Sequence, residues 1–446
     1  MPILGLPPNQ PDPYPAHFSI ESAIRPNILA LHPYRCARDD YSEGILLDAN
    51  ENSLGHSIVS SSSSSPNADG TAAIEETLAL PLHRYPSPVH LPIKERIAAL
   101  RALPSPENVF LGVGSDEVLD LLIRVFVKPG ISADDRGNEK ILITPPTYGM
   151  YGVCAQVNDV GVVKVPLRVK EEEVNGREGG KDGRFSLDVE ALKKAVLKEK
   201  ELGNTVKVIF LCSPGNPTGT LIDLDSVKEV LEWEEFKGIV LVDEAYIDFV
   251  GSAEDSDPDA EVRKASAGSL IGKYDNLVVT QTFSKGFGLA GIRLGIALAS
   301  LPVVQILSNT KAPYNVSVPT AHLAEKALTP ESLEFWRSNV RTLKANRASL
   351  ISSLRSLAET ASGVGPIIGS NDANFILVRI MQKGDNTKAD SDRAQKVYKY
   401  LAEQVGVVVR YRGNELGCEG CLRVTIGTEE ENSEVLKRLV EALEKN

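Results

Sequence analysis

Apolar positions between residues 80 and 315 fall in short runs that alternate with longer amphipathic stretches. The runs are apolar at consecutive positions, which is typical of strands covered by helices on both faces. Strands are predicted at Val109–Val113, Lys140–Thr144, Lys207–Leu211, Gly238–Val242 and Asn276–Thr280. Helices are predicted between them at Asp116–Val127, Tyr148–Val157 and Leu224–Trp233. We therefore expect a large α/β domain over residues 80–315, with a doubly wound, mainly parallel sheet.

The pattern changes after residue 315. Long helices are predicted at Pro319–Ala327 and Ser332–Leu357. Strands at Phe375–Arg379, Val407–Val409 and Leu422–Ile426 and a last helix at Glu430–Glu444 follow. We expect a smaller α+β domain over residues 316–446. Residues 1–79 are predicted to be an N-terminal arm that partly joins the small domain.

The arm contains a run of six serines, Ser60–Ser65, which is typical of a linker-like insertion. An inert loop is favoured there over a phosphorylation site. Further stretches rich in polar, charged or glycine residues are predicted to be surface loops, at Ser132–Glu139, Glu171–Gly183, Gly251–Gly268 and Gln382–Asp392.

Composition narrows the classes of function. The 446 residues carry a net charge of −12, which argues against a broad nucleic-acid surface. No apolar run reaches the ~18–20 residues that span a membrane. The N-terminus lacks the pattern of a signal or transit peptide, so we expect a cytoplasmic protein. Five scattered cysteines indicate a reducing compartment. A zinc or redox site at Cys418 and Cys421 is the less favoured alternative.

The predicted strands end in small and polar residues, and ligands of such sheets gather at the carboxyl ends of the strands. The segment Gly112–Glu117 opens a helix, whose free N–H groups suit a phosphate, although a plain capped turn fits equally. Tyr148 could stack on a planar ligand or pack in the core. The turn Ser213–Gly219 would hold the amide of Asn216 rigidly, or it is an ordinary turn.

Two further strand ends carry ionisable residues. Asp243 ends an apolar strand, where a carboxylate is costly unless it is paired, so it could bind a metal or pair with a cofactor nitrogen. Lys285 lies in Thr282–Arg293, just after a buried strand. Desolvation there lowers an amine pKa and makes a nucleophile. The alternative is an exposed loop lysine.

Taken together, these strand ends supply an amide, a carboxylate, a tyrosine, a lysine and an arginine. That combination matches the needs of pyridoxal phosphate. A lysine forms a Schiff base with the aldehyde of the cofactor, and an aspartate keeps the ring nitrogen protonated. Cations and helix N–H groups bind the phosphate.

The chain resembles the fold-type I, pyridoxal-phosphate-dependent aminotransferases over nearly its whole length. The segments that carry the resemblance are Leu47–Asn52, Arg84–Pro86, Gly114–Glu117, Pro145–Tyr151, Asn216–Gly219, Val242–Tyr246, Thr282–Arg293 and Cys421–Thr428. The first and last are similar to those of the histidinol-phosphate aminotransferases. The chain departs from the family at Ser53, where proline is frequent, at Ser213, where asparagine is frequent, and in the serine run.

The resemblance implies a role for each matching residue, and no metal. Lys285 would hold the cofactor aldehyde and move the proton, and Asp243 would pair with the ring nitrogen. The remaining cofactor contacts would be Asn216 and Tyr246 at the ring hydroxyl, Tyr148 on the ring face, and Ser115, Asp116, Ser284 and Arg293 at the phosphate. Tyr85 would reach the phosphate of a partner subunit, which implies a homodimer with shared active sites.

The resemblance also implies the reaction. Glutamate would donate its amino group to the cofactor, and imidazole-acetol phosphate would accept it to give histidinol phosphate, in histidine biosynthesis. The candidate substrate residues are Tyr34, Asn50, Arg410 and Arg423, because arginine suits both carboxylate and phosphate. The alternatives are an aromatic aminotransferase or a decarboxylase of the same fold. A non-catalytic cofactor-binding regulator is the least favoured.

Overall fold

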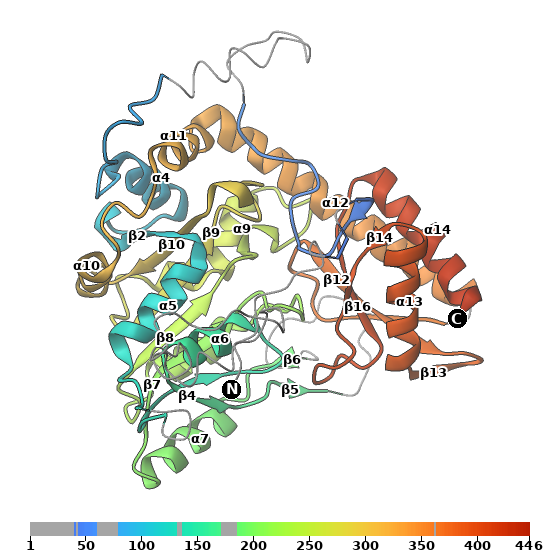
Figure 1. Cartoon of the computed structure of the whole chain (residues 1–446), viewed down its shortest axis with the longest axis horizontal. Coiled ribbons are helices and arrows are strands. Elements are labelled where there is room, and N and C mark those ends of the chain that lie inside the picture. The colour runs from blue at the N-terminus through green and yellow to red at the C-terminus, as the bar shows by residue number, and fades with distance from the viewer. Residues whose placement is uncertain (1–39, 42, 60–78, 132–135, 171–184, 361–362) are drawn as a thin grey trace, which may run out of the picture.

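The computed structural model describes residues 40–41, 43–59, 79–131, 136–170, 185–360 and 363–446. Figure 1 shows a large sheet with its helices on one side of the molecule and a smaller sheet on the other. The long helix α12 (Pro330–Thr360) extends from the large part to the small one. The predicted arm before residue 40, the serine run and the loop Glu171–Gly183 lie outside the described residues.

The large sheet has seven strands and is parallel except at one strand. In spatial order they are β2 (Val109–Val113), β10 (Leu294–Ala299), β9 (Leu277–Thr282), β8 (Ile239–Asp243), β7 (Thr205–Cys212), β3 (Glu139–Ile143) and β4 (Gly161–Lys164). β10 runs antiparallel to both of its neighbours, and the other pairs are parallel. The predicted α/β fold with a mainly parallel sheet is confirmed, and all five predicted strands are present.

Successive residues of a central strand pack into two different cores. On β8, Ile239 and Leu241 belong to one hydrophobic cluster, while Val240 and Val242 belong to the other. All four side chains are buried, and each contributes roughly 1.5–3 kcal/mol to folding. This two-sided burial is the reason for the uninterrupted apolar runs.

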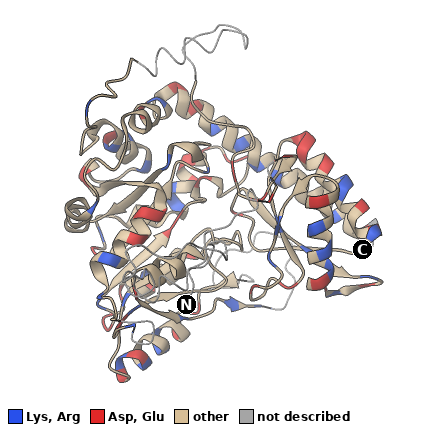
Figure 2. Cartoon of the chain, in the orientation of Figure 1, with Lys and Arg blue, Asp and Glu red and all other residues tan. Residues whose placement is uncertain are grey.

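Helices cover both faces of this sheet. The first cluster is completed by α5 (Gly114–Phe126), α6 (Met150–Val157) and α10 (Leu301–Thr310). The second cluster takes in α4 (Leu91–Arg101), α7 (Val189–Glu201) and α8 (Leu224–Leu231). In Figure 2 the charged residues lie largely on helices and few of them lie on the strands of the large sheet. The predicted helices within 80–315 correspond to α5, α6 and α8, with ends shifted by one or two residues.

The smaller sheet is antiparallel. Its order is β11 (Val364–Ile368), β12 (Phe375–Gln382), β16 (Cys421–Thr425) and β15 (Arg410–Tyr411), and β13 (Asp385–Ala389) also pairs with β12. The helices beside it are α12, α13 (Ser391–Gln404) and α14 (Glu429–Lys445), and α11 (Val318–Ala327) precedes them. The arm contributes β1 (Ile45–Leu46), which pairs in parallel with β14 (Val407–Val408). The domain limits stay a prediction.

Two stretches that were predicted to be surface loops contain regular structure, so those predictions were wrong. Gly251–Gly268 contains α9 (Pro258–Ala265) and the start of the 3₁₀ turn η4 (Ala267–Leu270). Gln382–Asp392 contains β13 and the start of α13. Only Val262 of α9 is buried, and β13 is an exposed edge strand. Neither element therefore carries the apolar period on which the sequence analysis relied.

A buried arginine of α12 joins the large part of the molecule to the small one. Nη1 of Arg347 donates to the carbonyls of Phe249 and Ala373, at 3.0 and 2.8 Å, and Nη2 donates to Gly251 at 2.9 Å. Phe249 and Gly251 follow β8, whereas Ala373 precedes β12. Arg347 thereby satisfies three carbonyls that lie on the two sides of the cleft described below.

Replacing this arginine should destabilise the protein. Arg347→Leu leaves buried carbonyls without donors, so the free energy of unfolding should fall by roughly 3 kcal/mol. Urea denaturation followed by tryptophan fluorescence measures the change. Arg341→Gln, at an exposed position of the same helix, is the matched control and should stay within about 0.5 kcal/mol of the wild type. Equal stability of the two variants would contradict this role of Arg347.

Candidate active site

A cleft of about 600 Å³ opens at the carboxyl edge of the large sheet, beneath β15 and β16 of the small one. Parallel strands bring their carboxyl ends to one edge, so residues far apart in the chain meet there. Twelve of the fourteen predicted site residues line this cleft: Asn50, Ser115, Asp116, Tyr148, Asn216, Asp243, Tyr246, Ser284, Lys285, Arg293, Arg410 and Arg423.

Asp243 ends β8 at the floor of the cleft and is almost fully buried. Its Oδ2 accepts a hydrogen bond from the hydroxyl of Tyr151 at 2.8 Å, and its Oδ1 accepts one from Thr280 at 3.0 Å. Burial raises the pKa of this carboxyl to about 6, and the two hydroxyls oppose that rise. Asp243 is therefore largely ionised at neutral pH and can pair with a positive group.

Lys285 lies in the turn after β9, half-buried, with its amine in the cleft. Nζ donates to the carbonyl of Ala49 at 2.7 Å. Burial, followed by the neighbouring guanidinium groups of Arg423 and Arg293, lowers the pKa of this amine to about 8. At pH 7 an amine with such a pKa is uncharged, and hence nucleophilic, in roughly a tenth of molecules, far more than for an ordinary lysine.

The other end of the cleft is built to bind an anion. Helix α5 begins at Gly114, so the backbone N–H groups of Ser115 and Asp116 point out of its first turn. Nη2 of Arg293 lies so close to Gly114 that an added Cβ would meet it at 2.5 Å. A Cβ on Gly295 would lie 2.2 Å from the nitrogen of Ser115. Glycine at both positions lets strand, helix and guanidinium come together.

The carboxylate of Asp116 balances this positive end. It lies 3.5 Å from Nη2 of Arg293, and it accepts a hydrogen bond of 3.2 Å from the hydroxyl of Tyr148. The ring of Tyr148 packs edge-on against Tyr151, with centroids 5.7 Å apart. Tyr148 therefore stands beside the cleft between the anion-binding end and Asp243.

Asn216 and Tyr246 are linked to the small sheet. Oδ1 of Asn216 accepts a 2.7 Å hydrogen bond from Nη1 of Arg423 on β16. The hydroxyl of Tyr246 accepts one of 3.0 Å from Nδ2 of Asn50, whose Oδ1 in turn accepts from Thr425. Burial raises the pKa of Tyr246 to about 12, so its hydroxyl stays protonated and can donate to a ligand.

Two predicted residues are not part of this cleft as described. Tyr85 is 82% exposed and stacks on Tyr314, with centroids 4.7 Å apart. Tyr34 lies outside the described residues. Sequence reasoning in turn missed Tyr151 and Thr280, the two hydroxyls that bind Asp243. Thr280 ends the predicted strand Asn276–Thr280, and this strand pairs with the one that ends in Asp243. The position of Thr280 at that strand end could therefore have indicated its contact with Asp243.

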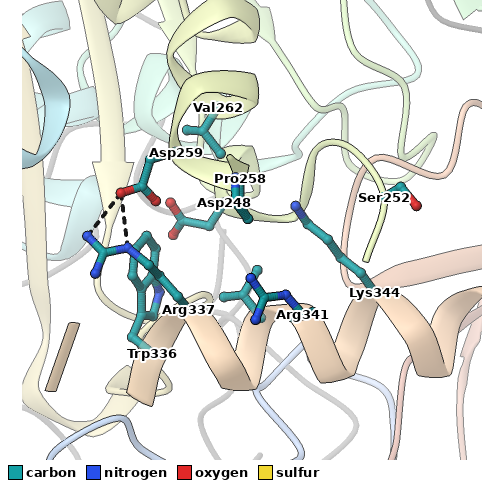
Figure 3. A pocket seen from close by; sticks show the side chains of 10 residues that line it. Asp248, Ser252, Pro258, Asp259, Val262, Trp336, Arg337, Arg341 and Lys344 are labelled. Atoms are coloured by element: carbon teal, nitrogen blue, oxygen red, sulfur yellow. Dashed lines mark hydrogen bonds and ion pairs between the residues drawn. The ribbon is translucent and has the colours of Figure 1, made fainter. Parts of the chain in front are cut away.

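The turn that carries Lys285 is supported from behind by stacked aromatic rings. Phe283 stacks on Phe287 and Phe287 on Trp336, with centroids 4.5 and 4.9 Å apart. Figure 3 shows the second pocket beside Trp336, where Arg337 reaches Asp259 at 2.9 and 3.0 Å. This pocket shares no lining residue with the cleft. The stack packs helix α12 against the turn, with Phe283 and Phe287 on either side of Lys285 in the chain.

The cysteines contribute thiols and no crosslinks among the described residues. Cys154, Cys212, Cys418 and Cys421 are free and buried. Within the described ranges, no group of three or more His, Cys, Asp or Glu side chains is arranged to hold a metal ion. Over the same residues, no helix combines the length and apolar character needed to cross a bilayer.

Comparison with known proteins decides the family. The profile of "Aminotransferase class I and II" matches residues 42–439. The chain belongs to this family. Among curated proteins it is similar to the histidinol-phosphate aminotransferase of Schizosaccharomyces pombe, at 42% identity over 95% of this chain and 97% of that protein. The histidinol-phosphate aminotransferase of Saccharomyces cerevisiae is 41% identical over 96% and 98%.

Solved structures agree on the fold of this aminotransferase. The histidinol-phosphate aminotransferase of Sinorhizobium meliloti in complex with pyridoxal-5'-phosphate superposes with a TM-score of 0.71, covering 95% of this chain and 98% of that one, at 18% identity. The enzyme of Clostridium acetobutylicum gives a TM-score of 0.68 over 90% and 100%, at 22% identity.

The aminotransferase depends on pyridoxal phosphate, and its cleft fits that cofactor. The ionised carboxylate of Asp243 suits a protonated ring nitrogen, and the amine of Lys285 suits an aldehyde. The glycine-lined start of α5, with Arg293, suits a phosphate. The ring nitrogen, the aldehyde and the phosphate of the cofactor thus each have a complementary group within the same cleft.

The lowered pKa of Lys285 predicts its reactivity in the cofactor-free protein. Labelling by trinitrobenzenesulfonate requires the uncharged amine, so labelling of Lys285 should rise with pH with a midpoint near its pKa of about 8. Peptide mass spectrometry measures the rate. The control is Lys228, because its hydrogen bond to Asp225 raises the pKa of that amine and labelling should still rise above pH 10. A Lys285 midpoint that matches Lys228 would contradict the desolvated site.

Proposed function

We propose that the chain transfers an amino group between histidinol phosphate and 2-oxoglutarate, as a step of histidine biosynthesis. The observation that carries this proposal is the similarity of about 42% over nearly the full length to curated histidinol-phosphate aminotransferases. The arginines of the cleft support it, because both substrates of that reaction are anions. Phosphate and carboxylate are bound well by the planar fork of a guanidinium.

The proposed cofactor contacts follow from the cleft. Asp243 pairs with the ring nitrogen, Asn216 and Tyr246 hydrogen-bond the ring hydroxyl, and Tyr148 stacks on the ring. The phosphate takes the remaining donors, which are the N–H groups of Ser115 and Asp116, the hydroxyl of Ser284 and the guanidinium of Arg293. When bound, pyridoxal phosphate supplies an electron sink for the bond that breaks at the substrate Cα.

Lys285 is the proposed acid and base of the reaction. Its amine would take the proton from Cα of the amino donor in one half-reaction and would deliver a proton to Cα of the new amine in the other. The pKa of about 8 suits this exchange, because both protonation states are populated near neutral pH. Its Nζ lies in the cleft and donates to the carbonyl of Ala49 at 2.7 Å.

Arg423 and Arg410 are proposed to bind the anionic group of each substrate. Nη2 of Arg423 donates to the carbonyl of Asp48 at 2.5 Å, and Nη1 donates to Asn216, so the guanidinium is fixed in the cleft. Burial lowers the pKa of Arg423 to about 9, and the group remains largely charged at neutral pH. Asn50 and Tyr34 are proposed to complete this part of the site.

We also propose that the active unit is a cytoplasmic homodimer with shared sites. Tyr85 is too exposed to serve the cleft of its own chain, which supports a contact with a partner subunit's cofactor phosphate. The four free thiols are consistent with a reducing compartment. Neither nucleic acid nor membrane is part of the proposed function.

A comparison of amino donors tests the substrate. With 2-oxoglutarate as acceptor, kcat/KM for histidinol phosphate should exceed that for phenylalanine by at least about 100-fold, because phenylalanine has no phosphate for the arginines. Steady-state assay of glutamate formation measures both. Equal values would instead favour an aromatic aminotransferase of the same fold, and no turnover with either would favour a cofactor-binding regulator.

A further inference from the structure

A third arginine of the small sheet, Arg412, lines the cleft beside Arg410 and Arg423 and has no role so far. It follows β15, and its backbone N–H donates to the carbonyl of Cys421 at 2.9 Å. Nη1 donates to Oε1 of Glu415 at 2.7 Å. The side chain is three-quarters buried, so this arginine is held in place by its surroundings.

Arg412 lies near Arg423 on the small sheet, because Arg410 pairs with Arg423 across β15 and β16 and Arg412 follows Arg410 by two residues, on the same side of the extended chain. Among neighbouring charges, Arg423 contributes most to lowering the pKa of Lys285. After burial, Arg412 contributes most to lowering the pKa of Arg423. Arg412 and Lys285 line the same cleft as Arg423. A substrate whose first anionic group meets Arg423 extends its far end toward Arg412.

The two substrate pairs differ at that far end. This step rests on the proposed function. Histidinol phosphate and its keto form end in an imidazole, which is mostly uncharged at neutral pH. Glutamate and 2-oxoglutarate end in a second carboxylate. One pocket therefore has to accept an uncharged ring in one half-reaction and a negative charge in the other.

The contacts of Arg412 suit both kinds of far end, the uncharged imidazole and the carboxylate. Within the part of the chain that the structure describes, Nε of Arg412 is buried and has no hydrogen-bond partner, and a buried donor without an acceptor is costly. Glu415 neutralises the charge through Nη1 while an uncharged ring is present. A carboxylate that enters the cleft would find the Nε–H of the same guanidinium still without an acceptor among the described residues.

We propose that Arg412, positioned by Glu415, binds the far carboxylate of glutamate and 2-oxoglutarate and so determines that this site accepts dicarboxylates as well as imidazole substrates.

Separate measurement of the half-reactions tests this assignment. Cofactor-loaded protein is mixed with glutamate alone or with histidinol phosphate alone, and the cofactor absorbance is followed through a single turnover. In Arg412→Gln, kcat/KM for glutamate should fall about 10- to 100-fold, mainly through KM, because one charge-assisted contact is lost. The value for histidinol phosphate should stay within about threefold.

A binding measurement provides a readout that does not depend on turnover. Titration calorimetry with glutarate, an unreactive five-carbon dicarboxylate, should show a similar loss of affinity in cofactor-free Arg412→Gln. In Glu415→Gln the guanidinium is no longer neutralised, so glutarate should bind at least as tightly as to the wild type. Thermal melting of each variant checks that the fold is retained.

The matched control is Arg438→Gln on α14, which removes a guanidinium that also pairs with glutamates but lies away from the cleft. Both half-reactions should be unchanged there. The assignment would be overturned if Arg412→Gln lost both half-reactions equally or lost neither. A selective loss of the glutamate half-reaction in Arg410→Gln instead would also overturn it. Failure of wild-type protein to react with histidinol phosphate would refute the proposed function alone, since glutarate binding still tests Arg412.

Discussion

The site depends on keeping one carboxylate charged inside the protein. Asp243 ends a strand that is buried on both faces, where an unpaired negative charge is strongly disfavoured. Hydroxyl donors from Tyr151 and Thr280 offset part of that cost, but the pKa of the carboxyl remains raised, at about 6. A positive group in the cleft would offset the remaining cost of the buried charge, and the protonated ring nitrogen of pyridoxal phosphate is such a group. In the proposed arrangement, the protonated ring of the cofactor and the charge of Asp243 would stabilise each other.

The fold provides the positions for this arrangement. Parallel strands set Asp243, Asn216 and Lys285 at one edge, and the first turn of α5 faces them with its N–H groups. The small sheet closes the cleft from the other side with arginines on β15 and β16. The hydrogen bond between Arg423 and Asn216 crosses from one sheet to the other, so it links a residue proposed to bind substrate with one proposed to bind the cofactor.

Much of the fold and of the cleft could be predicted because the strands of a buried parallel sheet are apolar at consecutive positions and end at one edge. The apolar runs gave the strands, and the polar residue that ends each run gave the cleft. Tyr151 and Thr280 were not assigned, because their contact with Asp243 depends on strand register and on the rotation of α6. The polar elements α9 and β13 were missed for lack of an apolar period. The role of Arg412 depends on the path of the chain between β15 and β16, which no local pattern specifies.

The rate of the glutamate half-reaction in Asp243→Asn tests the central claim most directly. The amide keeps the shape of the side chain but cannot hold a proton on the ring nitrogen by charge. We expect borohydride to reduce the cofactor onto Lys285 as in the wild type, while the single-turnover rate with glutamate falls by about 100-fold or more. A rate within threefold of the wild type, with the cofactor bound, would contradict the account.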